Sequence, residues 1–430
     1  MTISRGWALV ATLLCVPGVV CRCPASADRI ECHREMDITG LPKGTTGYFG
    51  RADTKLTTYK GAIYCAYLDV ERFVRIRRRG PDGEVTDAKV FGPVAADPYH
   101  MPPVIGLDGD GYIHVAAGMH DARQWVYYIS EESESIDRFA KQEPGSARCP
   151  PGMFITYPEF ARDRKGYLYV TSRQGTKNPS FLGGCIARYD HMTRTWTPLG
   201  VEMDRWNFII WHPKDQWYQQ WYMRVHFDRA NNLHLAWKVN AIGPTPNFGD
   251  GSHLMYACLP EGETTWRTVE DAPIAGLPLT TDNASVIATD LENPELVPYG
   301  LGVQSDGKPV VNFRYVRGNT PEGRDKGWLS RWTGTRWQRV FFPREVVIPT
   351  LLMSDNRGGL FTHSPGGNTG YLSRDSGATW DVITIPYERG YAGYHSLDYQ
   401  HFIETGEPRI AAFFADDGAI EVWTLRTVEQ

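Results

Sequence analysis

The segment "DGDGYIHV", Asp108–Val115, decides the fold because it recurs along the chain. It returns as "DRKGYLYV" at Asp163–Val170 and as "DRANNLHL" at Asp228–Leu235. Each copy begins with a polar turn, in which Gly or Asn can adopt the left-handed backbone conformation, and continues with apolar residues. This pattern is typical of a tight turn between two antiparallel strands. Its repetition indicates a protein built from similar β-hairpins.

Looser copies of the turn extend the repeat to seven positions. These positions are Gly61, Gly111, Gly166, Asn231, Gly307, Gly358 and Gly406. Seven hairpins, spaced by 48 to 76 residues, predict an all-β protein with a single domain, a seven-bladed β-propeller. A β-sandwich with irregular hairpins is the alternative, because the spacing is uneven.

The outer part of one unit carries a second signature. The segment "SRDSGATW", Ser373–Trp380, matches the Asp-box pattern S-x-D-x-G-x-T-W. In an Asp-box the Asp caps a hairpin turn and the Trp packs between blades. The motif therefore supports a propeller and says nothing about catalysis.

The composition agrees with an all-β protein that binds no nucleic acid. The 430 residues include 29 Pro and 43 Gly, and 12% are aromatic, which favours many short strands over long helices. The formal net charge is -5, and the main basic run is "RIRRRG" at Arg75–Gly80. We interpret this short run as a solvated strand edge, so nucleic acid is not an expected partner.

The N-terminal residues have the pattern of a secretory signal peptide. Arg5 precedes the apolar run Trp7–Val20, and "PASA" ends at Ala27 in an A-x-A cleavage pattern. We therefore expect a signal peptide at 1–27 and a propeller domain at 28–430, in a secreted or periplasmic protein without a membrane span in the mature chain. An uncleaved membrane anchor is the alternative, but the apolar run is short for one.

Five cysteines follow the predicted cleavage position: Cys32, Cys65, Cys149, Cys185 and Cys258. Export would permit disulfide bonds, but the number is odd and no C-x-x-C pair remains. We expect at most two disulfides and one free thiol, and the spacing does not support a zinc site.

The ends of the hairpins away from the turns bring polar residues together. In an antiparallel hairpin, residues equally distant from the turn face each other. The turn at Gly109 places His100 and His120 nearly opposite one another, where the first hairpin opens. In the next hairpin the same argument places Tyr157 opposite Arg173.

Two further units contribute to the same rim. A shift of 65 residues, from Asp163 to Asp228, carries the tyrosine–arginine pair to Tyr222 and Lys238, with Arg224 two residues after the tyrosine. The predicted rim residues are His100, His120, Tyr157, Arg173, Tyr222, Arg224, Lys238 and Arg314. Cations gathered on one face of a negatively charged chain predict an anion-binding site.

These residue types suit the removal of a proton next to a carboxylate. Cations neutralise the carboxylate and stabilise the developing enolate, while His or Tyr moves protons. This chemistry is β-elimination at O4 of a uronic acid. Glycoside hydrolysis usually needs two facing carboxyl groups, for which Asp121 and Glu159 are the nearest candidates.

Each rim residue also has a structural reading, since a His or Tyr at a strand end commonly packs and an Arg near a loop is commonly solvated. We interpret His114 and His234, which lie inside predicted strands, as structural. Asp108 and Asp110 could suggest calcium, but their place in a hairpin turn favours turn formation.

Three segments together resemble a known family. They are "HMPPVIGLDGDGYIHVAAGMH", "TYPEFARDRKGYLYVTSRQG" and "RVHFDRANNLHLAWK", beginning at His100, Thr156 and Arg224. They are similar to the BNR-type propellers that include ulvan lyases and rhamnosyl-glucuronate lyases. The resemblance implies a secreted seven-bladed β-propeller that cleaves a rhamnose linked to O4 of a glucuronate, in a polysaccharide such as ulvan or gum arabic.

The resemblance also implies roles for individual residues. His100 and His120 would serve in proton transfer and substrate positioning, Tyr157 as an acid or base partner, and Arg173 and Arg224 as carboxylate neutralisers. No cofactor is implied for the chemistry. A structural calcium ion is implied by some relatives, but the sequence shows no ligand set for it.

Two departures from the family pattern leave the exact polymer open. "HMPP" at 100–103 replaces H-N-x-P, and "KVN" at 238–240 stands where W-R-E is common. The partner we expect is an anionic, uronate-containing polysaccharide, bound by a monomer. The alternatives are a sialidase-like glycoside hydrolase, suggested by the Asp-box, and a non-catalytic carbohydrate-binding propeller, suggested by the 14 Trp.

Overall fold

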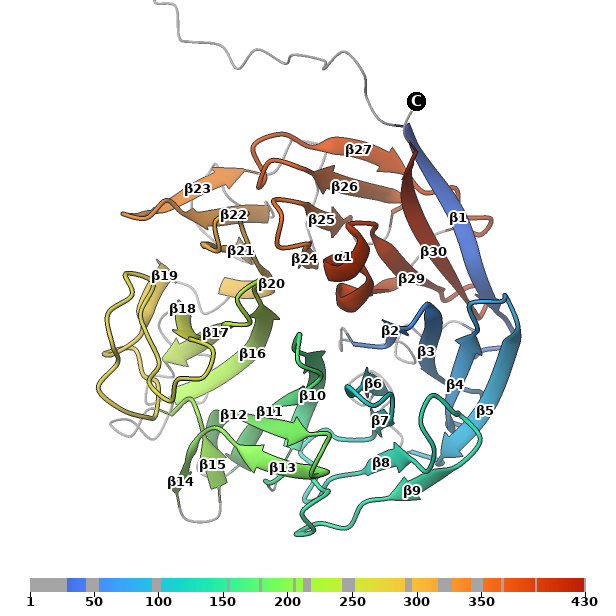
Figure 1. Cartoon of the computed structure of the whole chain (residues 1–430), viewed down its shortest axis with the longest axis horizontal. Helices are drawn as coiled ribbons and strands as arrows, with labels where there is room; N and C mark the ends of the chain where they lie inside the picture. The colour runs from blue at the N-terminus through green and yellow to red at the C-terminus, as the bar shows by residue number, and fades with distance from the viewer. Residues whose placement is uncertain are drawn as a thin grey trace, which may run out of the picture.

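The computed structural model describes thirteen segments of the chain. They are residues 29–43, 54–94, 102–152, 155–177, 180–203, 206–211, 218–241, 252–290, 296–315, 327–341, 351–364, 367–390 and 393–428. Seven blades surround a central axis, and Figure 1 shows them as a ring. Blades 3 and 4 are joined into one eight-stranded sheet by the pair Leu182–Gln219. The prediction of an all-β, seven-bladed propeller with a single domain is confirmed.

Blades 1 to 6 are each built from four consecutive strands, with the first strand nearest the axis (Figure 1). Blade 1 contains β2 (Leu56–Tyr59), β3 (Ala62–Leu68), β4 (Val74–Arg79) and β5 (Val85–Phe91). Blade 2 contains β6 (Val104–Leu107), β7 (Ile113–Ala116), β8 (Tyr127–Ser130) and β9 (Phe139–Lys141). Blade 3 contains β10 (Ile155–Arg162), β11 (Leu168–Lys177), β12 (Ser180–Asp190) and β13 (Thr195–Pro198).

Blades 4 to 6 follow after a short extra hairpin between blades 3 and 4. The hairpin consists of β14 (Val201–Met203) and β15 (Trp206–Phe208). Blade 4 contains β16 (Tyr218–Phe227), β17 (Leu233–Ala241), β18 (Ser252–Leu259) and β19 (Ser285–Asp290). Blade 5 contains β20 (Leu296–Val303), β21 (Pro309–Tyr315), β22 (Gly327–Trp332) and β23 (Trp337–Phe341). Blade 6 contains β24 (Leu352–Ser354), β25 (Leu360–His363), β26 (Thr369–Ser373) and β27 (Asp381–Thr384).

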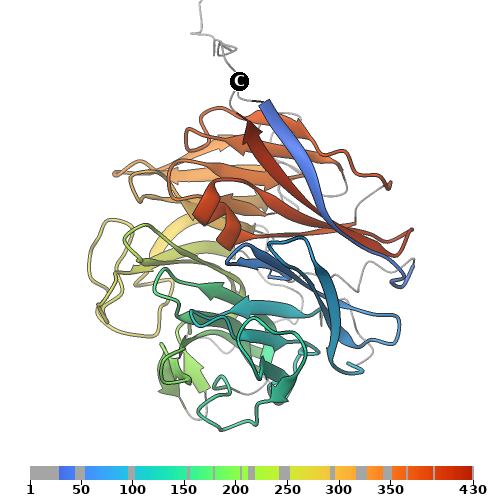
Figure 2. The ribbon, with the colours of Figure 1, turned by 45° about the vertical axis from the view of Figure 1, so that its right-hand side comes forward.

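Blade 7 joins the two ends of the described chain. Its inner strands are β28 (Tyr394–Leu397), β29 (Arg409–Phe414) and β30 (Ala419–Val428), and its outermost strand is β1 (Arg29–Ile38). Strands β1 and β30 pair antiparallel along almost their whole length, as Figure 2 shows. The ring is therefore closed by backbone hydrogen bonds between its first and last strands. The predicted signal peptide at 1–27 lies outside the described residues.

The predicted turns form because their Asp side chains hold the backbone. The Asp108 carboxylate accepts hydrogen bonds from the backbone N–H groups of Asp110, at 3.0 Å, and Tyr112, at 2.9 Å. Asp163 holds the next blade's turn in the same way, through Lys165 and Tyr167. Gly111 and Gly166 have φ of 83° and 90° at these turns, which glycine adopts without strain. Asp108 is thus a turn former, as predicted.

Two strand histidines are structural, as predicted. His114 is buried, with Nε2 3.2 Å from the Asp108 carboxylate and Nδ1 against the Tyr127 hydroxyl. His234 repeats the arrangement in blade 4, with Nδ1 2.7 Å from the Tyr256 hydroxyl. Each imidazole therefore ties the turn of its own blade to a tyrosine of the third strand.

The Asp-box forms the turn between β26 and β27. The Asp375 carboxylate accepts hydrogen bonds from the Thr379 backbone N–H, at 2.8 Å, and the Thr379 hydroxyl, at 2.7 Å. Trp380 packs against the apolar cluster between blades 5 and 6. The motif is thus structural, as expected.

The apolar core is divided among the seams of the ring. Clusters of buried apolar side chains lie between each pair of neighbouring blades in the part of the chain that the structure describes. Between blades 2 and 3, for example, Tyr127 packs against Phe160 and Trp196. Burying such large side chains at every seam supplies the main favourable free energy for folding and keeps the blades in register around the axis.

The basic run of β4 is paired and half-buried, so its interpretation as a solvated edge was wrong. Arg75 and Arg77 both contact Asp87, at 2.6 and 3.0 Å, and Arg79 lies 3.1 Å from Glu35. Carboxylates on β5 and β1 therefore neutralise the run, a relationship that spacing along β4 does not reveal.

The five cysteines form no disulfide among the described residues, although up to two were allowed by the sequence. Cys65, Cys149 and Cys185 are buried in different blades. Burial raises the pKa of the Cys65 and Cys149 thiols to about 12, so both are unreactive. Within the described part, no helix is long and apolar enough to cross a membrane.

Helix α1 (Tyr399–Thr405) stands in blade 7 where the other blades have a hairpin turn. Asp398 caps its N-terminus by accepting from the His401 N–H at 3.0 Å, and Gly406, with φ of 77°, ends it. Glu404 lies 3.4 Å from Arg162 of blade 3. Since blade 3 belongs to the other side of the ring, α1 reaches over the axis on the face that carries the turns (Figure 1).

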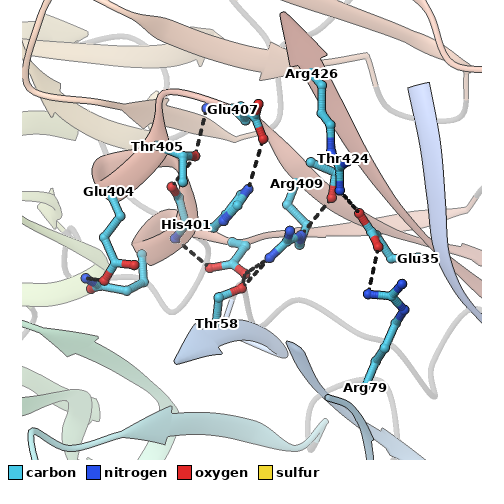
Figure 3. A network of polar contacts seen from close by, with 12 residues as sticks. Glu35, Thr58, Arg79, His401, Glu404, Thr405, Glu407, Arg409, Thr424 and Arg426 are labelled. Atoms are coloured by element: carbon cyan, nitrogen blue, oxygen red, sulfur yellow. Dashed lines mark hydrogen bonds and ion pairs between the residues drawn. The ribbon is translucent and has the colours of Figure 1, made fainter. Parts of the chain in front are cut away.

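A polar network beneath α1 ties blade 7 to blade 1 and, within blade 7, strand β1 to β30 (Figure 3). Buried Asp398 contacts the Thr58 hydroxyl and lies 3.8 Å from Arg409. Glu35 of β1 lies 3.2 Å from Arg426. These contacts supplement the β1–β30 pairing at the seam where the ring closes.

Candidate functional site

The candidate site lies at the open ends of the hairpins, on the face opposite α1. Six predicted rim residues have described side chains: His120, Tyr157, Arg173, Tyr222, Arg224 and Lys238. His100 lies outside the described residues. Arg314 is described only as part of β21, where its backbone is opposite Val297.

Two β-bulges shape the inner wall of the site. The first interrupts β10 between Thr156 and Glu159, and the second interrupts β16 between Trp221 and Arg224. Tyr157 has φ of 54° and Tyr222 φ of 49°, in the left-handed region that bulky residues rarely adopt. Such a conformation costs roughly 1–3 kcal/mol and is concentrated at functional sites. Bulges commonly re-aim a side chain beside an active site.

The bulges also correct the predicted pairing by one residue. Arg173 is opposite Thr156 and not Tyr157, and Lys238 is opposite Trp221. Counting from the turn assumed an uninterrupted ladder, and each bulge inserts an extra residue into it. The predicted neighbours still lie close together, because each bulged tyrosine directly follows the paired position.

The loop after β7 is fastened to β10 and brings His120 to the site. Ala122 and Ile155 exchange backbone hydrogen bonds of 3.1 and 2.8 Å. The backbone N–H of Asp121 donates to the buried Thr156 hydroxyl at 2.8 Å. As a result, the His120 ring stacks on the Tyr157 ring, with centroids 5.8 Å apart and planes 23° from parallel.

Arg173 completes a stack of three side chains from two blades. Its guanidinium carbon lies 5.0 Å from the centroid of the Tyr157 ring, and its Nη2 lies 3.9 Å from Asp121 Oδ1. Burial lowers the pKa of Arg173, while Tyr157, Asp121 and Tyr222 act in the opposite direction. We call His120, Tyr157 and Arg173 the His–Tyr–Arg stack. It places a buried cation over the ring of Tyr157, which also contacts His120, and Tyr and His side chains can both exchange protons.

Lys238 repeats in blade 4 the position that Arg173 has in blade 3. Each cation is opposite the residue that precedes a bulged tyrosine, and each is buried. Tyr222 is half-buried and close enough to Arg173 to influence its pKa. The two tyrosine–cation pairs predicted from the 65-residue shift are therefore neighbours on the same wall.

Arg224 has a different environment from Arg173. Its Nη1 lies 2.8 and 2.9 Å from the two carboxylate oxygens of Glu159, and its Nε donates to the Tyr299 carbonyl at 3.1 Å. Both side chains are largely buried. Glu159 therefore compensates the charge of Arg224, and the contact joins the inner strands of blades 3, 4 and 5.

Sequence reasoning missed Thr156 and the Glu159–Arg224 pair. A signal for the pair exists in "TYPE" at 156–159 and "WYMR" at 221–224. Each has a tyrosine followed two residues later by a charge, and the two charges are opposite. No comparable signal marks Thr156, whose role depends on a loop of blade 2.

Clusters of His, Cys, Asp and Glu side chains commonly bind metals. Among the described residues, no group of three or more such side chains is arranged to hold an ion. The structural calcium ion that the family resemblance implies stays a prediction.

Residues 62–344, well over half of the chain, match the family model described as "BNR repeat-containing family member". The chain belongs to this BNR repeat-containing family. No curated protein matches the chain significantly.

Solved structures of this propeller type include polysaccharide lyases. An ulvan lyase of family PL25 is similar with a TM-score of 0.67 and 14% identity, over 90% of this chain and 95% of that one. The polysaccharide lyase Uly1 has a TM-score of 0.66 and 12% identity, over 90% and 92%. A puromycin hydrolase, with a TM-score of 0.50 and 11% identity, covers 87% of this chain with 53% of its own. The propeller fold is thus shared by enzymes with different reactions.

Proposed function

We propose that this protein is a polysaccharide lyase that breaks a bond at O4 of a uronic acid by β-elimination. The observation that carries the proposal is the His–Tyr–Arg stack. It combines two proton-exchanging groups with a buried guanidinium, which is the set that abstraction of a proton beside a carboxylate requires.

In the proposed reaction, Arg173 and Lys238 bind the carboxylate of the uronate. One member of the pair His120 and Tyr157 removes the proton from C5, and the cations stabilise the enolate-like charge that develops on the carboxylate. The electron pair then forms the C4–C5 double bond as the C4–O4 bond breaks. The other member donates a proton to the leaving oxygen. His100, predicted on the same rim, would assist in proton transfer or positioning.

The proposed substrate is a polysaccharide that contains rhamnose and glucuronate, such as ulvan or gum arabic. An ulvan lyase of family PL25 that is 14% identical to this chain has been solved with -[GlcA(1-4)Rha3S]- bound. That ligand contains glucuronate and rhamnose, the two sugars that the family resemblance predicts. Action on an external polymer agrees with the predicted signal peptide, so we propose a secreted or periplasmic, monomeric enzyme.

A glycoside hydrolase is the second candidate, and the geometry disfavours it. Two catalytic carboxyl groups would have to face the sugar. Glu159 is held by Arg224, and Asp121 is held by the Thr156 hydroxyl at 3.2 Å. Neither carboxylate is placed as an acid or nucleophile for a glycosidic bond.

One assay distinguishes a lyase, a hydrolase and a binding protein. The purified protein is incubated with ulvan, gum arabic and other glucuronate polymers, and both ultraviolet absorbance and new reducing ends are measured. A lyase produces an unsaturated uronate chromophore in proportion to the reducing ends. Reducing ends without the chromophore would instead establish a hydrolase, and binding without products a carbohydrate-binding propeller.

A further inference from the structure

Three consecutive inner strands are interrupted at the same level of the ring. Bulges occur in β10 between Thr156 and Glu159, in β16 between Trp221 and Arg224, and in β20 between Pro298 and Gly300. Glu159 and Arg224 are the first paired residues after their bulges. The carbonyl that Arg224 contacts belongs to Tyr299, inside the third bulge. We call the contact of Glu159, Arg224 and the Tyr299 carbonyl the brace.

We propose that Glu159 and Arg224 are positioning residues, which hold the bulged tyrosines Tyr157 and Tyr222 in place and do not bind the substrate. This inference rests on the proposed lyase function, because it concerns the geometry of the same site. It assigns Arg224 a role different from the carboxylate neutraliser that the family resemblance implies.

The backbone strain of the site explains why a brace is needed. Tyr157 and Tyr222 both have left-handed φ values, which persist only where the surrounding structure imposes them. Glu159 and Arg224 each lie two residues after one of these tyrosines. A charge-assisted contact between them, with distances of 2.8 and 2.9 Å, fixes the end of one bulge against the end of the other.

The two arginines of the site differ in what they contact. Arg224 lies within hydrogen-bond distance of both oxygens of Glu159. Arg173 lies 3.9 Å from the nearest oxygen of Asp121 and faces the ring of Tyr157. A guanidinium that is already paired with one carboxylate gains less binding free energy from a second carboxylate. The contact with Glu159 therefore favours a supporting role for Arg224.

The kinetic test uses Glu159→Gln, which keeps the side-chain shape and removes the charge. We expect kcat on the preferred uronate polymer to fall about 10- to 100-fold, because small misplacements of reacting groups have effects of this size. KM should stay within about twofold, since misplacement of the reacting groups weakens stabilisation of the transition state and leaves binding of the ground-state substrate almost unchanged. Glu159→Asp, which retains the carboxylate, should recover more of kcat than Glu159→Ala.

The matched control is the pair Arg389–Glu421 in blade 7. Its contact is 2.6 Å and Glu421 is fully buried, but it lies outside the site. Glu421→Gln should change thermal stability as much as Glu159→Gln does and leave kcat unchanged. If Arg224 instead binds the substrate carboxylate, Glu159→Gln should lower KM, because a competing carboxylate has been removed. That result would overturn the inference.

A crystal structure of Glu159→Gln tests the brace without any activity. We expect Tyr157 or Tyr222 to leave the left-handed region, and retention of both left-handed conformations would refute the brace. If the wild-type protein cleaves no uronate polymer, the proposed function fails, but this structural result still decides whether the brace holds the tyrosines. The two proposals can therefore fail separately.

Discussion

The ring of His120 lies almost parallel to the ring of Tyr157, although the two residues belong to different blades. The contact depends on backbone hydrogen bonds that fasten the loop of blade 2 to the inner strand of blade 3. The geometry of the two rings therefore depends on how these two blades meet. Isolated hairpins could not reproduce it.

Tyr157→Phe should abolish most of the activity without disturbing the fold. The ring and its stacking on His120 remain, and only the hydroxyl that exchanges a proton is lost. We expect kcat to fall at least about 100-fold, the usual contribution of a positioned acid or base. The measurement is the rate of chromophore formation, with circular dichroism to verify folding. Tyr167→Phe, at the turn of the same blade on the opposite face, should keep full activity.

His100→Ala and Arg173→Ala should each remove activity while the protein remains folded. Arg173 supplies the buried positive charge beside Tyr157, and His100 is predicted on the same rim. Loss of either group should lower kcat/KM by roughly 100-fold or more, as loss of one stabilising donor does in other enzymes. Near-normal turnover by both variants would show that the active site lies elsewhere.

Acid should destabilise the protein below about pH 6.5, the ordinary pKa of histidine. Burial lowers the pKa of His226 and His401 to about 4 and that of His395 to about 3. Unfolding raises each pKa, so the unfolded chain binds more protons in this range and stability falls as pH falls. We expect a loss of about 2 kcal/mol for each fully buried histidine between pH 7 and pH 5.

Urea unfolding at several pH values, followed by tryptophan fluorescence, measures this dependence. His395→Asn removes one of the titrating groups, which lies beside His363 with ring centroids 3.9 Å apart. The variant should therefore show a shallower loss of stability with acid. An unfolding free energy that is constant from pH 7 to pH 5 would contradict the explanation.

Asp398→Ala should destabilise the ring closure without changing the chemistry. The substitution removes the buried partner of Arg409 and the N-cap of α1. Loss of one member of a buried ion pair costs about 3–5 kcal/mol, and thermal or urea unfolding measures it. Activity at low temperature should persist, because the network lies on the face opposite the site. The exposed Glu404→Gln should change stability by less than about 1 kcal/mol.

The fold was predictable because its turns are local. Asp108 and Gly111 lie three residues apart, and the same geometry recurs in blade after blade. Closure by β1 was not predicted, since the pairing of Arg29 with Val428 joins segments almost a whole chain apart. The neutralised basic run of β4 was missed for the same reason: the partner of Arg79 is Glu35, on β1.

The sequence predicted which residues of the candidate site lie near one another. It did not predict how their backbones pair. Counting from the turns identified Tyr157 and Arg173 as close, and the structure places them in contact. The count could not reveal a bulge, because an extra residue in one strand leaves no mark in a single sequence. It also could not show that Arg224 contacts Glu159. That contact depends on how the inner strands of blades 3 and 4 are placed relative to one another along the ring axis.

The pairing of β1 with β30 has a consequence for protein synthesis. Blade 7 takes its outer strand from the first described residues and its other three strands from the last. A nascent chain can complete six blades on the ribosome and still have no closed ring. Until β30 emerges, the unpaired strand edge and the apolar seam of blade 1 remain available for wrong contacts. Pairing of β30 with β1 is therefore the step that closes the ring.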